Sequence, residues 1–339
     1  MDSEKVVIVL LNYNGWRDTL ECLESVLKLD HPHFQVVVVD NDSSDGSVEN
    51  IQAWAAGTLA ADVQNNVLSS MSMPAQPKPV PLEVLRDADV SASSEASRIV
   101  LIQSASNGGY AAGNNHGIRF AMNDPDCCYL WLLNNDTVVR PDALTHLVAR
   151  FEADPAVGVC GSALVHYHNP ATLQARGGAR FNRWTATSHH VGEGAAFPAE
   201  ADAGQDEVLD YVVGASMFVS RKFVEQVGLM YEDYFLYFEE IDWAWRRGSF
   251  TVAYAPGSVV YHKEGATTGM NKKAIQFGEG GDFYLHRNRL LFTRRNFLIG
   301  LPVVVLRLLA VAAKSIQARR WGRARMFLTP RFWFGSGKV

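Results

Sequence analysis

Four short apolar runs mark the first half of the chain, at residues 6–11, 35–39, 98–103 and 129–133. A run of branched apolar residues without polar alternation is typical of a strand that is buried on both faces of a parallel sheet. Stretches with helical spacing lie between these runs, so the order is strand, helix, strand. The pattern predicts an α/β fold with a mostly parallel central sheet flanked by helices.

The expected helices cover residues 16–28, a stretch that begins near Gly46, residues 111–122, and a stretch that begins at Pro141, where the missing N–H of proline is not needed. Residues 57–97 do not fit the alternation, because they are rich in serine, contain four prolines and show little periodicity. Connections in compact parallel sheets are rarely so long. We therefore predict a surface insertion at 57–97.

The charge of the chain is unevenly distributed. The 339 residues carry a net charge of −5, which argues against a nucleic-acid partner. After Asp282 there are twelve basic residues and no acidic one, which leaves nineteen basic and thirty-six acidic residues in 1–282. The sequence thus predicts an acidic body, 1–282, and a basic helical region, 283–339.

The basic region also contains a long apolar stretch. Residues 297–313 are apolar except for Arg307, which makes them marginal as a membrane span. Basic and aromatic residues alternate after this stretch, a pattern typical of an interfacial helix on an anionic membrane. The alternative is a helical subdomain that packs on the body.

The four cysteines show no CxxC spacing and no signal peptide is apparent, so we expect a cytoplasmic protein, peripheral on the inner face of the membrane.

Polar motifs follow the predicted strands, where open α/β sheets bind their ligands. NYNG at 12–15 follows the first strand, and DNDSSDGS at 40–47 follows the second and contains helix-capping residues. NGGYAAGNN at 107–115 opens a helix, which suits a diphosphate or a sugar. The chain lacks both the Lys-Ser/Thr of a P-loop and a GxGxxG after the first strand, which argues against P-loop NTPases and Rossmann dehydrogenases.

The fourth motif, Asn134-Asn135-Asp136-Thr137, ends an otherwise buried strand. Oxygen ligands at alternate positions suit Mg²⁺ or Mn²⁺, although a single carboxylate is a weak basis for a metal site. His262 ends another apolar run, and a lone histidine is more often structural than a ligand.

A block at 234–246 places Glu239, Glu240 and Asp242 among aromatic residues. Crowding of this kind raises the pKa of at least one carboxylate, as a general base working near neutral pH requires. If the block is helical, Arg246 shares a face with Glu239 and Asp242. A solvated acidic helix face is the alternative, and the flanking aromatic residues disfavour it.

Taken in this order, these segments resemble the family 2 glycosyltransferases with the GT-A fold, and more narrowly their rhamnosyltransferase-like branch. The matching motifs are NYNG at 12–15, VDNDSSDGS at 39–47, NGGYAAGNNHGI at 107–118, LLNNDT at 132–137, VGASMFVSR at 213–221, YFLYFEEIDWAWR at 234–246 and the histidine of VVYH at 259–262. The resemblance implies a GT-A catalytic domain over 1–282, with 57–97 as an insertion, and an appended basic amphipathic helical region over 283–339.

The resemblance also implies site residues. Glu240 would be the catalytic base, with Glu239 and Asp242 as its rivals. Asp136, Asn134 and His262 would hold Mg²⁺ or Mn²⁺. The residues expected to bind the nucleotide sugar are Asn12, Tyr13, Asn14, Asp40, Asp42, Asn107, Gly108, Asn114, Asn115, Asn135 and Arg246. Two positions depart from the family pattern, because Glu240 and Tyr231 stand where the family usually has aspartate.

The implied activity is inverting transfer of a sugar, above all rhamnose from dTDP-rhamnose, to a hydroxyl of a glycan or lipid-linked acceptor in cell-surface polysaccharide synthesis. A UDP-hexose donor is the main alternative. A sugar nucleotidyltransferase is less favoured, since NYNG is not a basic glycine-rich loop. A non-catalytic nucleotide-binding module would leave the carboxylates at 239–242 unexplained.

Overall fold

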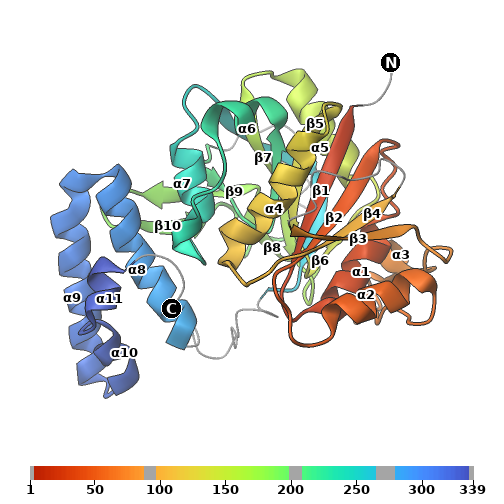
Figure 1. Cartoon of the computed structure of the whole chain (residues 1–339). Helices are drawn as coiled ribbons and strands as arrows, with labels where there is room; N and C mark the ends of the chain where they lie inside the picture. The colour runs from red at the N-terminus through yellow and green to blue at the C-terminus, as the bar shows by residue number, and fades with distance from the viewer. Residues whose placement is uncertain (1–3, 88–96, 198–207, 265–278, 336–339) are drawn as a thin grey trace.

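A computed structural model describes residues 4–87, 97–197, 208–264 and 279–335, and its centre is a ten-stranded sheet (Figure 1). The strands are, in spatial order, β3 (Leu82–Arg86), β4 (Ile99–Gln103), β2 (Phe34–Asp40), β1 (Lys5–Asn12), β5 (Cys127–Asn134), β12 (Ser216–Ser220), β7 (Val157–His166), β13 (Thr251–His262) and β6 (Thr137–Val139), with β8 (Leu173–Arg176) paired to β7. The strands from β3 to β5 are all parallel. The prediction of a mostly parallel central sheet is confirmed.

Helices cover both faces of the sheet, and successive residues of β1 point into the two cores that result. Val6, Ile8 and Leu10 pack with α1 (Trp16–Val26), α2 (Ser47–Ala56) and α5 (Ala143–Ala153). Val7 and Val9 pack on the other face with α4 (Gly109–Asn123) and α6 (Arg221–Val227). Successive side chains of a strand point to opposite faces, so a run without polar alternation is what a sheet buried on both sides requires.

The register of the parallel strands brings their polar ends to one edge. Asn12 at the end of β1 lies opposite Asp40 at the end of β2, and Asp40 lies opposite Gln103 of β4. Leu11 lies opposite Asn134 of β5. The motifs that follow these strands are therefore neighbours in space although they are far apart in the sequence.

The segment 57–97 is not wholly a surface excursion, which corrects the sequence prediction in part. Its residues Leu82–Arg86 form β3, which pairs in parallel with β4 at the edge of the sheet, and Ser69–Ser72 form the short helix α3. Residues 88–96 lie outside the described residues. The strand was missed because β3 is short and partly exposed, so its sequence lacks the apolar run of a central strand.

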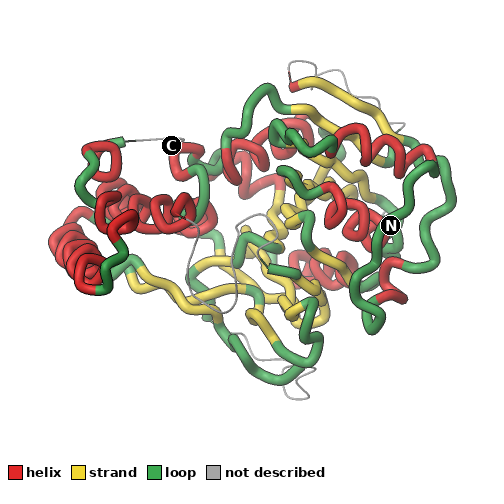
Figure 2. The backbone as a smooth tube through the Cα atoms, turned by 90° about the horizontal axis from the view of Figure 1, so that it is seen from below, coloured by secondary structure: helices red, strands yellow, loops and turns green. Residues whose placement is uncertain are grey.

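A small antiparallel sheet joins the body to the C-terminal helices. It consists of β9 (Gly178–Asn182), β10 (Thr187–His190) and β11 (Tyr211–Val212), and it lies beside α7 (Glu239–Trp245) (Figures 1 and 2). The C-terminal helices are α8 (Glu279–Asn296), α9 (Leu301–Gln317), α10 (Trp321–Met326) and α11 (Pro330–Phe334). Helix α8 begins before residue 283, so the predicted boundary falls inside a helix.

The C-terminal helices share a hydrophobic cluster with α7 and also leave apolar surface uncovered. Phe238 and Ile241 of the body pack in one cluster with Phe292 and Leu308. Within the described residues, the segment Leu298–Gln317 is long and apolar enough to cross a membrane, and only 22% of it is buried. The region therefore packs on the body, as the alternative foreseen for it requires, and its exposed apolar surface leaves attachment to a membrane as a prediction.

Candidate active site

Asn12 organises the end of β1. Its amide nitrogen donates to Asp40 Oδ1 at 2.8 Å and to Ser43 Oγ at 3.2 Å, while its amide oxygen accepts from Thr19 Oγ1 at 2.9 Å. Asn12 and Asp40 are both buried. A buried amide with all these partners fixes the carboxylate of Asp40 in one orientation. The structure therefore gives Asn12 an orienting task.

The side chains available to a ligand at this edge come from the two loops that follow β1 and β2. Tyr13 and Asp42 are exposed, and Asn14 accepts a hydrogen bond from Ser44 N at 2.8 Å that joins the two loops. Asn135 donates to Thr19 Oγ1 at 2.9 Å and is buried beneath them. Of the residues predicted to bind the nucleotide sugar, Tyr13 and Asp42 thus face solvent and Asn135 supports the loops from inside.

The glycine loop at the start of α4 is held from both sides. Asn41, which the sequence analysis did not single out, donates to Asn107 Oδ1 at 3.0 Å and accepts from Gly108 N at 3.3 Å. Tyr110 N donates to Phe235 O at 2.7 Å. A Cβ at Gly109, whose φ is +87°, would lie 2.2 Å from the same oxygen. Only glycine allows this approach, which places the loop directly against the segment that precedes α7.

Asn114 and Asn115 lie in the first turns of α4, but they face the protein interior. Asn114 donates to Tyr110 O at 2.9 Å, and Asn115 donates to Met230 O at 2.9 Å and to Glu232 Oε1 at 2.8 Å. Both side chains are buried. The amide of Asn115 connects α4 to the segment before α7, and that of Asn114 bonds back to the first turn of α4. The structure thus offers both as supports of the loop and leaves the ligand contacts to Asn107 and Gly108.

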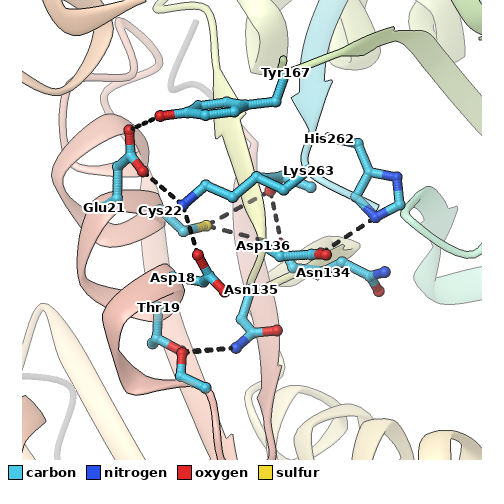
Figure 3. Close-up of polar contacts among 12 residues, drawn as sticks. Asp18, Thr19, Glu21, Cys22, Asn134, Asn135, Asp136, Tyr167, His262 and Lys263 are labelled. Carbon is cyan, nitrogen blue, oxygen red and sulfur yellow. Dashed lines mark hydrogen bonds and ion pairs between the residues drawn. The ribbon is translucent and has the colours of Figure 1, made fainter. Parts of the chain in front are cut away.

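Asp136 and His262 meet although 126 residues separate them. Asp136 Oδ1 lies 3.2 Å from His262 Nε2, and His262 Nδ1 lies 2.9 Å from Gln174 Oε1. Burial raises the pKa of Asp136, but the charge and hydrogen bond of His262 outweigh it and hold the pKa below its usual value. Figure 3 shows Asn134 beside this pair. The side chains come together because β6 and β13 are paired at this end of the sheet.

The residues at this position fit a metal ion that is shared with a ligand. The described part of the chain contains no group of three or more His, Cys, Asp or Glu residues with metal-binding geometry. Mg²⁺ and Mn²⁺ commonly take one or two protein carboxylates and complete their shell with water and substrate phosphates. One carboxylate, one imidazole and an amide oxygen match that requirement in the presence of a diphosphate.

Lys263 forms a buried ion cluster directly behind Asp136 (Figure 3). Its Nζ lies 2.6 Å from Asp18 Oδ1 and 2.6 Å from Glu21 Oε2, and Tyr167 donates to Glu21 Oε1 at 2.7 Å. Burial lowers the pKa of Lys263, but the two carboxylates outweigh it and raise the pKa. Sequence reasoning missed this cluster. The available signal was the pair of acidic residues, three apart, in a helix whose other positions are mostly apolar.

Asp242 and Arg246 form a structural pair, which revises their predicted roles. Asp242 is fully buried and accepts from Tyr234 Oη at 3.0 Å, Arg246 Nε at 2.8 Å and Asn296 Nδ2 at 2.8 Å. Arg246 also donates to the carbonyls of residues 227 and 229, both at 2.9 Å. These contacts occupy both groups. Asp242 is therefore not available as a base, and Arg246 is not available to bind the nucleotide sugar.

Glu239 and Glu240 remain as candidates for proton transfer. Burial and the charge of Glu240 raise the pKa of Glu239 well above its ordinary value, and burial raises the pKa of Glu240 to about 7. Glu239 is 1% exposed, whereas Glu240 is half-buried. A pKa of about 7 suits Glu240 to accept a proton near neutral pH, while the upward shift of the pKa of Glu239 favours its protonated form.

The backbone before α7 is strained. Phe235, Tyr237 and Phe238 have φ values of +66°, +70° and +80°, a region that non-glycine residues rarely occupy. Such strain costs about 1–3 kcal/mol per residue and persists only where the surrounding structure enforces it. Arg287 and Asn288 of α8 enforce it here by donating to the carbonyls of this loop, including Tyr234 O at 2.9 Å from both side chains.

Comparison with known proteins adds an independent observation. The family model described as "Glycosyl transferase family 2" matches residues 6–67 and 86–227, so the gap between the matched segments falls within 57–97. The low-salt glycan biosynthesis hexosyltransferase Agl10 of Haloferax volcanii is 26% identical over 152 residues, which are 43% of this chain and 45% of that protein. The chain thus matches less than half of the length of this relative.

Two solved structures have a similar fold. GalNAc-T7 with UDP, GalNAc and Mn²⁺ superposes with a TM-score of 0.53 at 13% identity, over 77% of this chain and 44% of that chain. The mannosyltransferase PcManGT from Pyrobaculum calidifontis, in complex with GDP-Man and Mn²⁺, superposes with a TM-score of 0.51 at 14% identity, over 97% of this chain and 82% of that chain. The predicted GT-A architecture is confirmed at the level of the fold.

We predict that Gly109→Ala destabilises the protein more than Gly194→Ala does. Both glycines have a positive φ, +87° and +78°, but a Cβ at Gly194 would have no heavy atom within 4 Å. The comparison therefore isolates the clash with Phe235 O from the cost of the backbone conformation. Urea unfolding measures both changes, and equal losses would show that the loop is not tightly docked.

Proposed function

The chain belongs to glycosyl transferase family 2, and we propose that it transfers a sugar, with inversion, from a nucleotide-sugar donor to a hydroxyl of a glycan or lipid-linked glycan. The observation that carries this proposal is the position of Glu240. Glu240 is half-buried, has a raised pKa and follows a strained loop that is docked on the glycine loop of α4. A base near neutral pH thus stands next to a helix N-terminus that suits a diphosphate.

We place the donor over the carboxyl ends of β1, β2 and β4. Tyr13 and Asp42 are exposed there, and Asp40 is held by Asn12. Asn107 and Gly108 lie at the start of the fifteen-residue helix α4, where the helix dipole favours the diphosphate. Among possible donors, the motif resemblance supports dTDP-rhamnose ahead of a UDP-hexose.

Asp136, His262 and Asn134 would hold Mg²⁺ or Mn²⁺ beside the donor diphosphate. A metal bound there would supply positive charge to the leaving group. The chain's own contribution is to fix Asp136 through His262 and through Lys263, whose backbone N–H donates to Asp136 O at 3.0 Å.

In the proposed reaction, Glu240 takes the proton of the acceptor hydroxyl. The acceptor oxygen forms a bond to the anomeric carbon while the bond from that carbon to the diphosphate oxygen breaks. The electron pair of the broken bond leaves with the nucleotide diphosphate. Burial and the charge of Glu240 raise the pKa of Glu239 and so favour its protonated form, and the acceptor has little access to it because it is 1% exposed.

We also propose that the enzyme works on the cytoplasmic face of a membrane. Leu298, Ile299 and Leu306 are 68%, 71% and 67% exposed. The exposed basic residues Lys314, Arg319, Arg320 and Arg325 follow in the same region. Apolar residues beside basic residues suit insertion into an anionic leaflet, which would bring the enzyme to a lipid-linked acceptor.

Glu240→Gln should lower kcat by about 10²- to 10⁴-fold, the usual contribution of a general base. Glu239→Gln should lower kcat far less, because burial and the charge of Glu240 raise the pKa of Glu239 well above its ordinary value and glutamine resembles the protonated acid that this shift favours. Release of nucleotide diphosphate in the presence of acceptor measures both variants. A greater loss with Glu239→Gln would identify Glu239 as the base.

The wild-type pH profile should show an acidic limb near pH 7. A base acts only when it is deprotonated, so a pKa raised to about 7 makes kcat/KM fall about tenfold per pH unit below that value and level off above it. An ordinary glutamate would place the limb near pH 4.3. A profile that is flat down to pH 5 would contradict the environment described for Glu240.

Donor identity can be tested by thermal unfolding with nucleotide sugars and Mn²⁺. A donor at 100 times its Kd stabilises the folded state by about 2.7 kcal/mol. We expect the largest shift with dTDP-rhamnose, a smaller shift with UDP-hexoses, and a reduced metal-dependent part of the shift for Asp136→Asn. A larger shift with a UDP-hexose would reassign the donor.

Membrane attachment can be tested by co-sedimentation with liposomes that contain anionic lipid. Substitution of Leu298, Ile299 and Leu306 by serine should release the full chain from the liposomes. Val67→Ser is a matched control, because Val67 is 76% exposed but lies in the body. Equal sedimentation of the triple variant and the control would rule out this surface as the attachment site.

A further inference from the structure

A pocket of about 510 Å³ lies between the β9–β10 hairpin and α7. Its walls come from residues 180–184 and His189 on the hairpin, from Asp210 and Tyr211, and from Ile241, Trp245 and Arg247 in and after α7. The volume is in the usual range for sites that bind small molecules. The donor site proposed above uses none of these residues, so the pocket is available to a second substrate.

Two residues of the pocket wall belong to the helix that carries Glu240. Ile241 and Trp245, which line the pocket, follow Glu240 in the same helix. Burial raises the pKa of Tyr211 in the pocket wall, and the charge of Glu240 raises it further. Burial also raises the pKa of Tyr110 in the glycine loop, and the charge of Glu240 raises it further. Glu240 is therefore within electrostatic reach of both the pocket and the glycine loop.

Two indole rings give the pocket flat apolar surfaces. Trp184 is 45% exposed and Trp245 is 37% exposed. Each ring is held by an edge-to-face contact with a phenylalanine near or in α8, Trp184 with Phe297 at 4.9 Å and Trp245 with Phe292 at 5.5 Å between centroids. These contacts fix the rings and leave apolar surface for a ligand. The C–H face of a sugar ring packs well on such a surface.

The pocket is also cationic, in contrast to the body around it. Its three arginines face a single carboxylate, Asp210, which lies 3.0 Å from Arg180 Nε. Arg183 lies over the ring of Phe297, and Arg247 donates to Ala244 O at 2.8 Å. No carboxylate of the described residues forms an ion pair with Arg183 or Arg247. Two guanidinium groups without a carboxylate partner among the described residues favour an anion, which arginine binds in a bidentate manner.

We propose that this pocket binds the acceptor, and that the acceptor carries an anionic group, phosphate or carboxylate, next to the sugar that Glu240 deprotonates. The inference rests on the proposed glycosyl transfer and specifies its second substrate. The indoles of Trp184 and Trp245 hold the sugar ring, and Arg183 and Arg247 bind the anion. A phosphate is favoured, because Phe297 beside Trp184 is followed by the exposed apolar residues Leu298 and Ile299, as a lipid-linked acceptor requires.

The test is calorimetric binding of glucose 1-phosphate, glucuronic acid and glucose to the full chain. We expect the anionic sugars to bind more tightly than glucose. The double variant Arg183→Gln/Arg247→Gln should weaken their binding at least tenfold and leave glucose unaffected, whereas Trp184→Ala should weaken all three. Arg86→Gln, an exposed arginine on the edge strand β3, is the matched control and should change nothing.

The outcomes separate the ligand classes and the two proposals. Tighter binding of glucose 1-phosphate indicates a phosphate-bearing acceptor, and tighter binding of glucuronic acid indicates a uronate. Equal binding of the anionic sugars and glucose, or loss of anion binding in Asp40→Asn but not in the arginine variant, would overturn the inference. The donor-induced thermal shift should persist in the arginine variant. If the wild-type protein showed no donor-induced thermal shift, the donor proposal would be contradicted and the result for the pocket would still hold.

Discussion

The buried ion cluster of Lys263 connects the two halves of the candidate active site. Lys263 directly follows β13, which lies in the last third of the sequence, whereas Asp18 and Glu21 belong to the first helix. Charges buried in this way are costly unless each is paired, so the cluster is stable only when α1 and the end of β13 are in place together. The same segment carries His262 and donates a backbone hydrogen bond to Asp136. The arrangement of Asp136 and His262 that is proposed to bind a metal therefore depends on the ion cluster of Lys263.

A second dependence links the base to the C-terminal helices. The three residues with positive φ before α7 are held by Arg287 and Asn288 of α8, and Asp242 of α7 accepts from Asn296 at the end of α8. The appended region thus contributes to the shape of the active site in addition to its exposed apolar surface. The proposed membrane-binding surface and the segment that positions Glu240 consequently belong to one packed unit.

The sequence allowed more of the fold to be predicted than of the site. The strands β1, β2, β4 and β5 were predicted because a strand buried on both faces must be apolar throughout. The edge strand β3 and the cluster around Lys263 were missed, since both depend on partners far away in the sequence. Asp242 and Glu240 lie two residues apart and have the same aromatic and acidic residues around them in the sequence. Only their contacts in the structure distinguish them, because the carboxylate of Asp242 is occupied by hydrogen bonds and Glu240 is half-buried. Asn114, Asn115 and Arg246 changed roles for the same reason.

The sequence by itself determined the kind of sheet, the order of its polar motifs and the types of residue available for chemistry, because these follow from local periodicity and composition. The tertiary structure decided which of those residues act together. Asp136 meets His262 through strand pairing, Gly109 meets Phe235 through loop docking, and the pocket is formed by the β9–β10 hairpin, by Asp210 and Tyr211, and by α7. Contacts between segments so far apart depend on packing free energy summed over the whole fold, which no local pattern in the sequence records.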